Sequence, residues 1–536
     1  MIYNPVKEYE QTFRPLHREK TTAFFEELVR RSGVNIEENR ETVRQYENCK
    51  ADLDALKKKL RWWKFLRVLM CITLVLIPLV IWKTTPKIRK LQEDVEHADQ
   101  RADDLLAQAH RQMQPLNRLF TDRDALTLIQ ETVPLLTFAP CFSVKQEADM
   151  KLNYDFTGGA ETEESTVDVL AGTYNENPFL FENRLIHTMG METYHGEKTI
   201  HWTETYRDSH GKLQRRSRSQ TLHASVTKPK PFYHTQVVLN YGSQGGPELS
   251  FSRDAGRLDR KSERALERHL RRGERKLERM TDAAIRNNDD FVSMSNTEFE
   301  VLFDALDRTN EVQFRALFSP LAQTNMTELI LSGTGYGDDF DFIKRKRMNR
   351  IVSTHSQNRE ITLPPAGYAS HSFDTIKENF IEKNVEYFRA VYFDFAPLLA
   401  IPAYQERPVH SLKPIPDYSQ LYSHKESEAL ANAVDHRHMV HPRTKTNAIL
   451  KASFVGSRGK TDETCITAYS YDIAKRVAVV SVFGGDGRFH DVRVPWDEYL
   501  PLEAENHFYI TEADEAKNKT VFARRNGLCI YRADHA

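Results

Sequence analysis

The chain has 536 residues, of which 28% are charged and 40% are hydrophobic, and its formal net charge is −1. This length allows two or three domains, and the near-neutral charge excludes a global positive field that would recruit nucleic acid or an anionic surface. The five cysteines are scattered, so they form no disulfide framework and favour a reducing compartment. They are Cys49, Cys71, Cys141, Cys465 and Cys529.

The only long apolar run lies between Trp62 and Trp82, WWKFLRVLMCITLVLIPLVIW. A membrane-crossing helix needs about 20 predominantly apolar residues, and flanking cations and tryptophans favour the membrane interface. The run therefore predicts one membrane segment, either a single span or a re-entrant hairpin bent near a proline, with a buried core helix as the alternative. The residues expected to form this anchor are Trp62, Trp63, Arg67, Pro78 and Trp82.

Apolar residues with heptad spacing flank this run on both sides. The upstream set is Tyr46, Cys49, Leu53, Leu56 and Leu60, and the downstream set is Ile88, Leu91, Val95, Ala98, Ala102, Leu105 and Ala109. Such stripes need a partner in water. In a re-entrant hairpin the two helices pair with each other, whereas in a true span each pairs with another copy or packs on its own domain. The expected partners are therefore the membrane and a protein partner or second copy held by the stalk helices of residues 1–61 and 83–115.

Residues 116–405 are expected to form an α+β domain rich in antiparallel hairpins. The segment Lys198–Val226 alternates apolar and polar residues around a break at 208–211, which predicts a hairpin, and Phe232–Tyr241 predicts a further strand. A charged helix is expected at about Leu258–Ile285. The segment Phe373–Leu399 predicts a helix followed by a core strand.

The C-terminal part is expected to contain a proline-rich linker and short helix at 406–446, followed by a small β domain at 447–536. Gly484-Gly485-Asp486-Gly487 predicts a turn between two of its strands. The predicted fold class is therefore α+β, with an N-terminal helical stalk, one membrane segment, a mixed central domain and a small C-terminal β domain.

One segment carries a pattern of aromatic, acidic and helix-starting residues: Glu298, Phe299, Glu300, Phe303, Asp307, Arg315, Ser319, Pro320 and Met326. In these residues the segment Asn296–Ile330 resembles a bacterial family whose domain has no assigned function, and His201-Trp202 gives a weaker match. The resemblance covers about a third of the chain and departs from the family at 258–285 and beyond 405. Members join a membrane segment and helical stalk to an α+β domain, so the resemblance implies architecture rather than chemistry.

Three histidines close together form the best metal candidate. His436, His438 and His441 could share one ion, with Asp435 or His424 completing the ligand shell. The alternative is a polar loop that enters the final sheet.

The charged helix is the candidate surface for an anionic partner. Between Arg253 and Arg279 the sequence has 11 cationic and 6 acidic residues. Nucleic acid or anionic lipid could bind such a surface, but the interleaved glutamates suit ion pairs four residues apart on a solvated face. The residues of this patch are Arg264, Arg268, Arg271 and Arg272.

Other patterns carry no chemistry. Gly333–Gly337 predicts a plain loop, because no Lys-Ser/Thr follows it and Asp338 and Asp339 would repel a phosphate. Asp394 is interpreted as a lone acid at a core edge or strand end. The sequence has no Gly-x-Ser-x-Gly elbow and no His-Glu-x-x-His helix. No catalytic residue and no cofactor is therefore assigned.

These observations favour a scaffold or interaction protein anchored in a bacterial membrane, with its large C-terminal region on the cytoplasmic side, rather than an enzyme. The stalk would hold the α+β and β domains where they can recruit a protein partner. Two alternatives are kept: a membrane-tethered, metal-dependent enzyme that uses His436, His438 and His441, and a nucleic-acid-binding module that uses the basic helix 253–279.

Overall fold

The computed structural model describes residues 2–71, 77–158, 163–207, 209–287, 291–357, 359–408, 413–516 and 519–532, with only the backbone described at 68–71 and 77–83. The chain divides into two compact units. Unit 1 comprises Met1–Pro5, Leu135–Ile361 and Asp394–Ala536, and unit 2 comprises Val6–Pro134 and Thr362–Phe393. The fold is mixed α+β, and both sheets are antiparallel.

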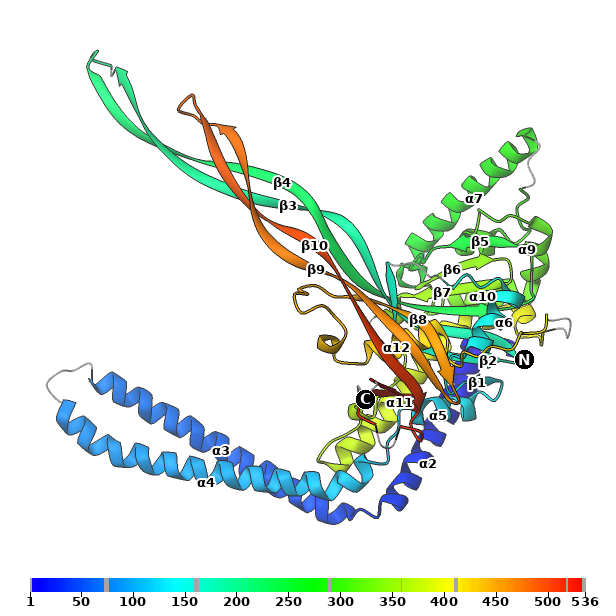
Figure 1. The fold of residues 1–536 in the computed structure, drawn as a ribbon, viewed down its shortest axis with the longest axis horizontal. Coiled ribbons are helices and arrows are strands. Elements are labelled where there is room, and N and C mark those ends of the chain that lie inside the picture. Colours follow the sequence, from blue (N-terminus) through cyan, green and yellow to red (C-terminus); the bar gives the residue numbers. More distant parts are fainter. Residues whose placement is uncertain are drawn as a thin grey trace. The chain divides into compact units, whose positions relative to one another are not determined.

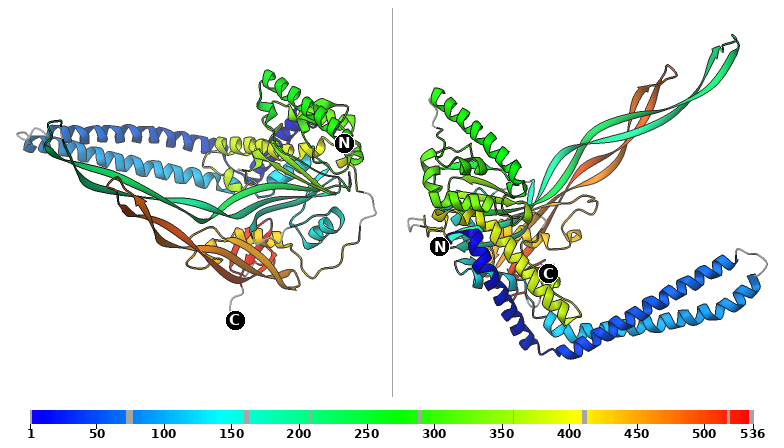
Figure 2. Two further views of the ribbon diagram at one scale, coloured as in Figure 1. Left: turned by 90° about the horizontal axis from the view of Figure 1, so that it is seen from above. Right: turned by 180° about the vertical axis from the view of Figure 1, so that it is seen from behind.

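Unit 2 is helical (Figure 2). Phenylalanines from the N-terminal helices and from α11 gather in its core, together with Met113, Leu116 and Leu128. Gly33 ends α2 with a φ of 64°, a left-handed conformation that favours glycine. Its elements are α1 (Pro5–Glu8), the π-helix η1 (Tyr9–Phe13), α2 (Arg14–Ser32), α3 (Ile36–Cys71), α4 (Ile77–Asn117), α5 (Asp124–Thr132) and α11 (Phe373–Leu399) as far as Phe393.

Helices α3 and α4 form an antiparallel helical hairpin. Lys57 Nζ lies 2.9 Å from Asp99, and the Asn39 amide donates to Gln112 over 3.3 Å. Leu53, Ala102 and Ala109 of the heptad stripes are buried. The two stripes therefore pack against each other within one chain. This is the pairing expected for the hairpin arrangement, and no second copy is needed to cover the stripes.

The membrane segment predicted at Trp62–Trp82 is wrong on the residues that the structure describes. Trp62, Trp63 and Arg67 belong to α3, which ends at Cys71, and α4 begins at Ile77. In the described ranges no helix is long and apolar enough to cross a membrane. The physical reason is that each of these helices contributes only a short apolar end to a long charged helix. The side chains of Pro78 and Trp82 lie outside the described residues.

Unit 1 contains a seven-stranded antiparallel sheet with the strand order β1-β2-β3-β4-β7-β6-β5 (Figure 1). Its strands are β1 (Leu136–Phe138), β2 (Glu164–Tyr174), β3 (Asn177–Arg207), β4 (Leu213–Gly242), β5 (Ser250–Arg253), β6 (Phe340–Arg345) and β7 (Met348–Ser353). The helices of this region are α6 (Val144–Tyr154), α7 (Glu263–Asn287), α8 (Thr297–Phe303), α9 (Glu311–Leu317) and α10 (Pro320–Ile330).

A second sheet of five strands follows in the order β11-β12-β10-β9-β8. Helix α12 (His424–Asn432) packs on it through Leu430 and Ala431, beside the buried side chains of Ile466, Phe508 and Ile530. The strands are β8 (Ile449–Arg458), β9 (Thr461–Phe483), β10 (Phe489–Glu512), β11 (Val521–Arg525) and β12 (Leu528–Tyr531).

Several predicted elements are present but differ in extent. The hairpin predicted at Lys198–Val226 is confirmed, but Phe232–Tyr241 is the end of β4 and not a separate strand. The turn predicted at 484–487 lies between two long strands, β9 and β10. The core strand predicted after Phe373 is wrong, because Phe373–Leu399 is a single helix.

Candidate functional site

Each sheet of unit 1 extends one long two-stranded hairpin, and the two hairpins run side by side (Figure 1). We define arm 1 as residues 187–233 of β3 and β4, and arm 2 as residues 471–501 of β9 and β10. Arm 1 begins where β3 stops pairing with β2, and arm 2 begins where β9 stops pairing with β8. Within each arm the two strands pair with each other over their described length.

The arms are held together by one apolar face of each ribbon. Ile200 and Leu222 of arm 1 pack with Val492 of arm 2, and Trp202 and Val482 pack against them. Because successive residues of a strand point to opposite faces, each arm has one face toward the other arm and one face turned away from it.

A close approach of the two backbones fixes how the arms cross. A Cβ atom on Gly196 would lie 2.3 Å from the carbonyl oxygen of Arg493, so only glycine fits there. Polar contacts add to this crossing. The Gly485 N–H donates to Gln220 Oε1 over 2.7 Å, and Lys198 Nζ donates to the Asp491 carbonyl over 3.2 Å.

The outer face of arm 2 carries a row of exposed apolar side chains. Val477, Val479 and Phe483 are 59%, 60% and 59% exposed, and Phe489 is 71% exposed. Phe483 lies directly opposite Phe489, with ring centroids 5.2 Å apart, and Val479 lies opposite Arg493. A solvated face of an antiparallel ribbon is normally polar, so this row is an exposed apolar patch of the kind that marks interaction sites. We call these four residues the apolar row.

The outer face of arm 1 is mixed, because Met189 and Met191 are 50% and 63% exposed on the same face as two threonine pairs. Thr193 and Thr227 share a hydrogen bond of 3.1 Å across the strands, as do Thr199 and Thr221. The outer face of arm 2 differs from this face by its exposed pair of aromatic side chains, Phe483 and Phe489.

The structure does not gather the predicted metal ligands. His436 and His438 lie on the short 3-10 helix His436–His438, where Asp435 accepts from Arg437. His438 contacts the Phe522 ring, and His441 Nδ1 accepts from the Arg443 N–H. His424 lies against the Ala452 carbonyl. In the described part of the chain no three His, Cys, Asp or Glu side chains are placed to hold a metal ion.

The predicted basic patch lies on α7. Arg264, Arg268, Arg271 and Arg272 are carried on one helix, and Arg271 pairs with Glu267 over 3.4 Å. Glycine at 273 allows close packing on α8, since a Cβ there would lie 2.2 Å from Val301 Cγ1. The ion pair agrees with the solvated-face interpretation, and binding of an anionic partner stays a prediction.

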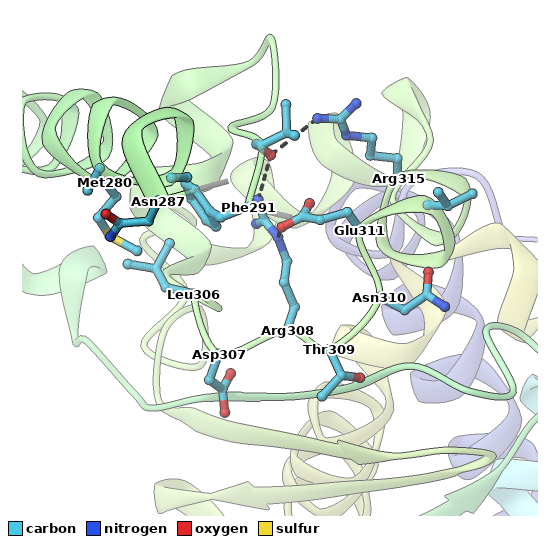
Figure 3. A pocket seen from close by; sticks show the side chains of 14 residues that line it. Met280, Asn287, Phe291, Leu306, Asp307, Arg308, Thr309, Asn310, Glu311 and Arg315 are labelled. Atoms are coloured by element: carbon cyan, nitrogen blue, oxygen red, sulfur yellow. Dashed lines mark hydrogen bonds and ion pairs between the residues drawn. The ribbon is translucent and has the colours of Figure 1, made fainter. Parts of the chain in front are cut away.

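Two residues of the family resemblance, Asp307 and Arg315, line a cavity of about 950 Å³ (Figure 3). Arg308 pairs with Glu300 over 2.6 Å and with Glu311 over 2.8 Å, and its guanidinium lies over the Phe314 ring. Arg315 donates to the Val292 carbonyl over 3.2 Å.

Other residues of the motif are structural as well. Asp307 accepts from the Ser252 N–H over 2.7 Å, Ser319 caps α10, and Phe299 and Phe303 stack in the core. The pattern therefore corresponds to a buried ion pair, a cap and an aromatic cluster, and the match itself stays a prediction.

Sequence reasoning missed a buried ionic cluster around His355. Its Nδ1 lies 2.8 Å from Asp339 and its Nε2 lies 3.2 Å from Asp394. Burial alone would lower the pKa of His355, but the two carboxylates raise it to about 10. Burial opposes ionisation of Asp394, yet His355 and Arg359 hold its pKa below the usual range. No spacing motif could reveal this cluster, because Asp339 and Asp394 come from distant segments.

The cluster resembles a hydrolase triad only in its residue types. Ser356 Oγ donates to Asp394 over 2.7 Å and not to His355. A protonated imidazole between two carboxylates has no free lone pair, so His355 cannot act as the base that a nucleophilic serine requires. The cluster stabilises unit 1 and supplies no hydrolytic chemistry.

No family model, curated protein or solved structure matches this chain.

Proposed function

We propose that this chain is an interaction protein that binds a protein partner through the apolar row of arm 2. The observation that supports this proposal is the exposure of Phe483 and Phe489 on the outer face of a ribbon whose other face already packs on arm 1. Large aromatic side chains supply most of the binding energy in protein interfaces, and they contribute little to stability where they face water.

The charge beside the apolar row indicates the chemistry of the partner. Arg493 is exposed opposite Val479 and makes no ion pair with any residue that the structure describes. The neighbouring Asp491 accepts from Ser481 over 2.6 Å. We therefore expect the partner to present an apolar patch with an Asp or Glu that faces Arg493. This role does not depend on the membrane anchoring that the sequence suggested.

Photo-crosslinking followed by quantitative binding tests the proposal. A benzoylphenylalanine at position 489 should cross-link a partner in cells, whereas the same probe at the exposed Val455 of β8 should not. The purified partner should then bind the double variant Phe483→Ser/Phe489→Ser at least about 30-fold more weakly than the wild type, which corresponds to about 2 kcal/mol.

The matched control is Val455→Ser, which removes exposed apolar surface from another strand and should bind like the wild type. Thermal melting should be nearly unchanged in both variants, because exposed substitutions change stability by only about 0.5 kcal/mol. Equal binding of wild type and double variant contradicts the proposal. So does cross-linking only to a second copy of the chain, which would assign the row to self-association.

A further inference from the structure

A cavity of about 960 Å³ in unit 1 is lined by more cationic than acidic side chains. Strands β3, β4 and β7 contribute to its wall, with α6, α12 and the turn between β6 and β7. The six cationic side chains are Lys151, Arg184, Arg345, Lys346, Arg350 and Lys425, and the three acidic ones are Asp155, Glu164 and Glu182.

Two arginines lie close together on this wall. Arg184 of β3 is opposite Gln236 of β4, and Arg350 of β7 is opposite Asn240 of β4. Arg184 and Arg350 both donate to Gln236 Oε1, over 2.8 Å and 3.0 Å. One amide oxygen therefore holds two guanidinium groups that would otherwise repel each other.

The carboxylates neutralise only part of this charge. Glu164 pairs with Arg184 over 2.8 Å, and Glu182 pairs with Lys425. Within the described ranges Arg350 has no carboxylate partner, and the Nε atoms of both arginines are buried without a hydrogen-bond partner. Glu147 also pairs with Lys151 over 2.7 Å. Because a guanidinium stays charged when it is buried, Arg350 leaves excess positive charge on this wall of the cavity.

We propose that this cavity binds a phosphate-bearing small molecule, whose phosphate is held between Arg184 and Arg350. A guanidinium offers planar pairs of N–H donors that match phosphate oxygens. A phosphate group has three terminal oxygens, so it can accept from both arginines at once. The cavity volume lies within the range of ligand pockets and leaves room for an organic group. The apolar side chains available to that group are Phe156, Ile186, Ile343 and Met348.

Glu164 provides a second test, because its substitution should strengthen phosphate binding instead of weakening it. Its carboxylate occupies Nη1 of Arg184 and lies on the wall of the same cavity, so it competes with an incoming phosphate. Removing the negative charge of Glu164 should therefore strengthen phosphate binding, whereas removing the positive charge of Arg350 should weaken it. A purely structural role of these side chains predicts no such pair of effects.

Isothermal titration calorimetry of the full chain with inorganic phosphate tests this site. Arg350→Gln should weaken phosphate binding at least tenfold, and Glu164→Gln should tighten it severalfold. The matched control is Arg264→Gln on α7, which removes the same charge from an exposed helix and should leave binding unchanged.

Thermal melting distinguishes a folded variant that binds phosphate weakly from a variant that does not fold. Phosphate should raise the melting temperature of the wild type and of Arg264→Gln, and it should not raise that of Arg350→Gln. If Arg350→Gln does not fold, Arg350→Lys keeps the charge but loses the paired donors, and it should bind phosphate severalfold more weakly.

Three results would overturn the proposal: no binding of phosphate to the wild type, unchanged binding in the Arg350 variant that folds, or weaker binding in Glu164→Gln. Acetate that binds as tightly as phosphate, with the same loss in Arg350→Gln, would replace phosphate by carboxylate as the ligand class. Variants of the apolar row of arm 2 should leave phosphate binding unchanged, so this site and the proposed partner surface can fail separately.

Discussion

Replacing His355 with glutamine should make unit 1 less stable than in the wild type at neutral pH. Most of that difference in stability should disappear at alkaline pH. Asp394 and Asp339 hold the imidazolium between them and raise the pKa of His355 to about 10, compared with about 6.5 in an unfolded chain. A raised pKa means that the stabilisation is fully present below pH 6.5 and is lost as the pH rises through 10.

The size of the effect follows from this shift. Each pKa unit corresponds to about 1.4 kcal/mol, so the protonated histidine contributes about 4 kcal/mol at pH 7 and less than about 1 kcal/mol at pH 10. The cost of leaving two buried carboxylates without their partner is of the same order, about 3–5 kcal/mol. The difference in unfolding free energy between wild type and His355→Gln should therefore fall by about 3 kcal/mol from pH 7 to pH 10.

Urea unfolding followed by limited proteolysis, with mass spectrometry of peptides from unit 1, measures this difference separately from unit 2. His195→Gln on arm 1 is the control, because that histidine is exposed and its loss should cost little at any pH. A destabilisation that stays constant from pH 7 to pH 10 would show that the charged imidazole does not hold the cluster together. No destabilisation at pH 7 would refute the ionic cluster itself.

Two further predictions concern other buried positions. In unit 2, burial lowers the pKa of His17 to about 4, so stability should be fully present above pH 6.5 and fall as the pH drops through 4. Urea unfolding should show the wild type losing about 3 kcal/mol more than His17→Gln between pH 7 and pH 4, and equal losses would contradict this. In unit 1, Gly196→Ala places a Cβ against the Arg493 carbonyl. It should destabilise the crossing of the arms by about 1–3 kcal/mol and speed hydrogen exchange in β10, whereas Thr199→Val on the outer face should not.

The hairpins could be predicted from the sequence because alternation is a local property of a strand, but their full length could not. The predicted hairpin ends at Val226, whereas β4 continues through Pro229 and Pro231, although proline is normally excluded from a paired strand. In β4 these two prolines lie two residues apart and therefore on the same face, opposite Met191 and Met189. In the described ranges no other strand pairs with β4 at these two positions. The N–H groups that the prolines lack would point away from β3, so their loss costs little.

The second half of helix α11 was wrongly predicted to be a strand because its local composition favours strands. The residues from Val385 to Leu399 include many aromatic and β-branched side chains, which favour strands when no packing is known. In the structure the stretch from Ala390 onward is buried almost completely, so it needs no polar face and shows no helical alternation. Tertiary packing overrides local propensity here.

The membrane prediction for the apolar run at Trp62–Trp82 was wrong because hydropathy alone does not show whether one continuous helix spans an apolar run. The charged and heptad-patterned residues on either side were sufficient to predict two helices that pair with each other, and that pairing is observed. A single span needs one long apolar helix, and no helix in the described ranges is long and apolar enough.

The charged cavity and the His355 cluster lie beyond what the sequence could predict. Glu182 and Lys425 form a buried ion pair although 243 positions separate them, and Asp339 and Asp394 meet at one imidazole. No spacing rule connects such residues, since only the fold brings them together. Sequence motifs can identify only sites built from one local segment, such as the histidines at 436–441. In the described part of the chain these histidines are not placed to bind a metal ion together.

The two arms together indicate why arm 2 has an apolar outer face. If the arms existed only to stabilise each other, both outer faces would be expected to be polar, because exposed aromatic side chains on a ribbon favour aggregation and add little stability. Arm 1 follows that expectation only in part, because its threonine pairs share the outer face with the exposed Met189 and Met191. Arm 2 departs from it only on the face that points away from arm 1, where Phe483 and Phe489 meet. A pair of exposed phenylalanines on the outer face of arm 2 is better explained by a binding partner than by folding.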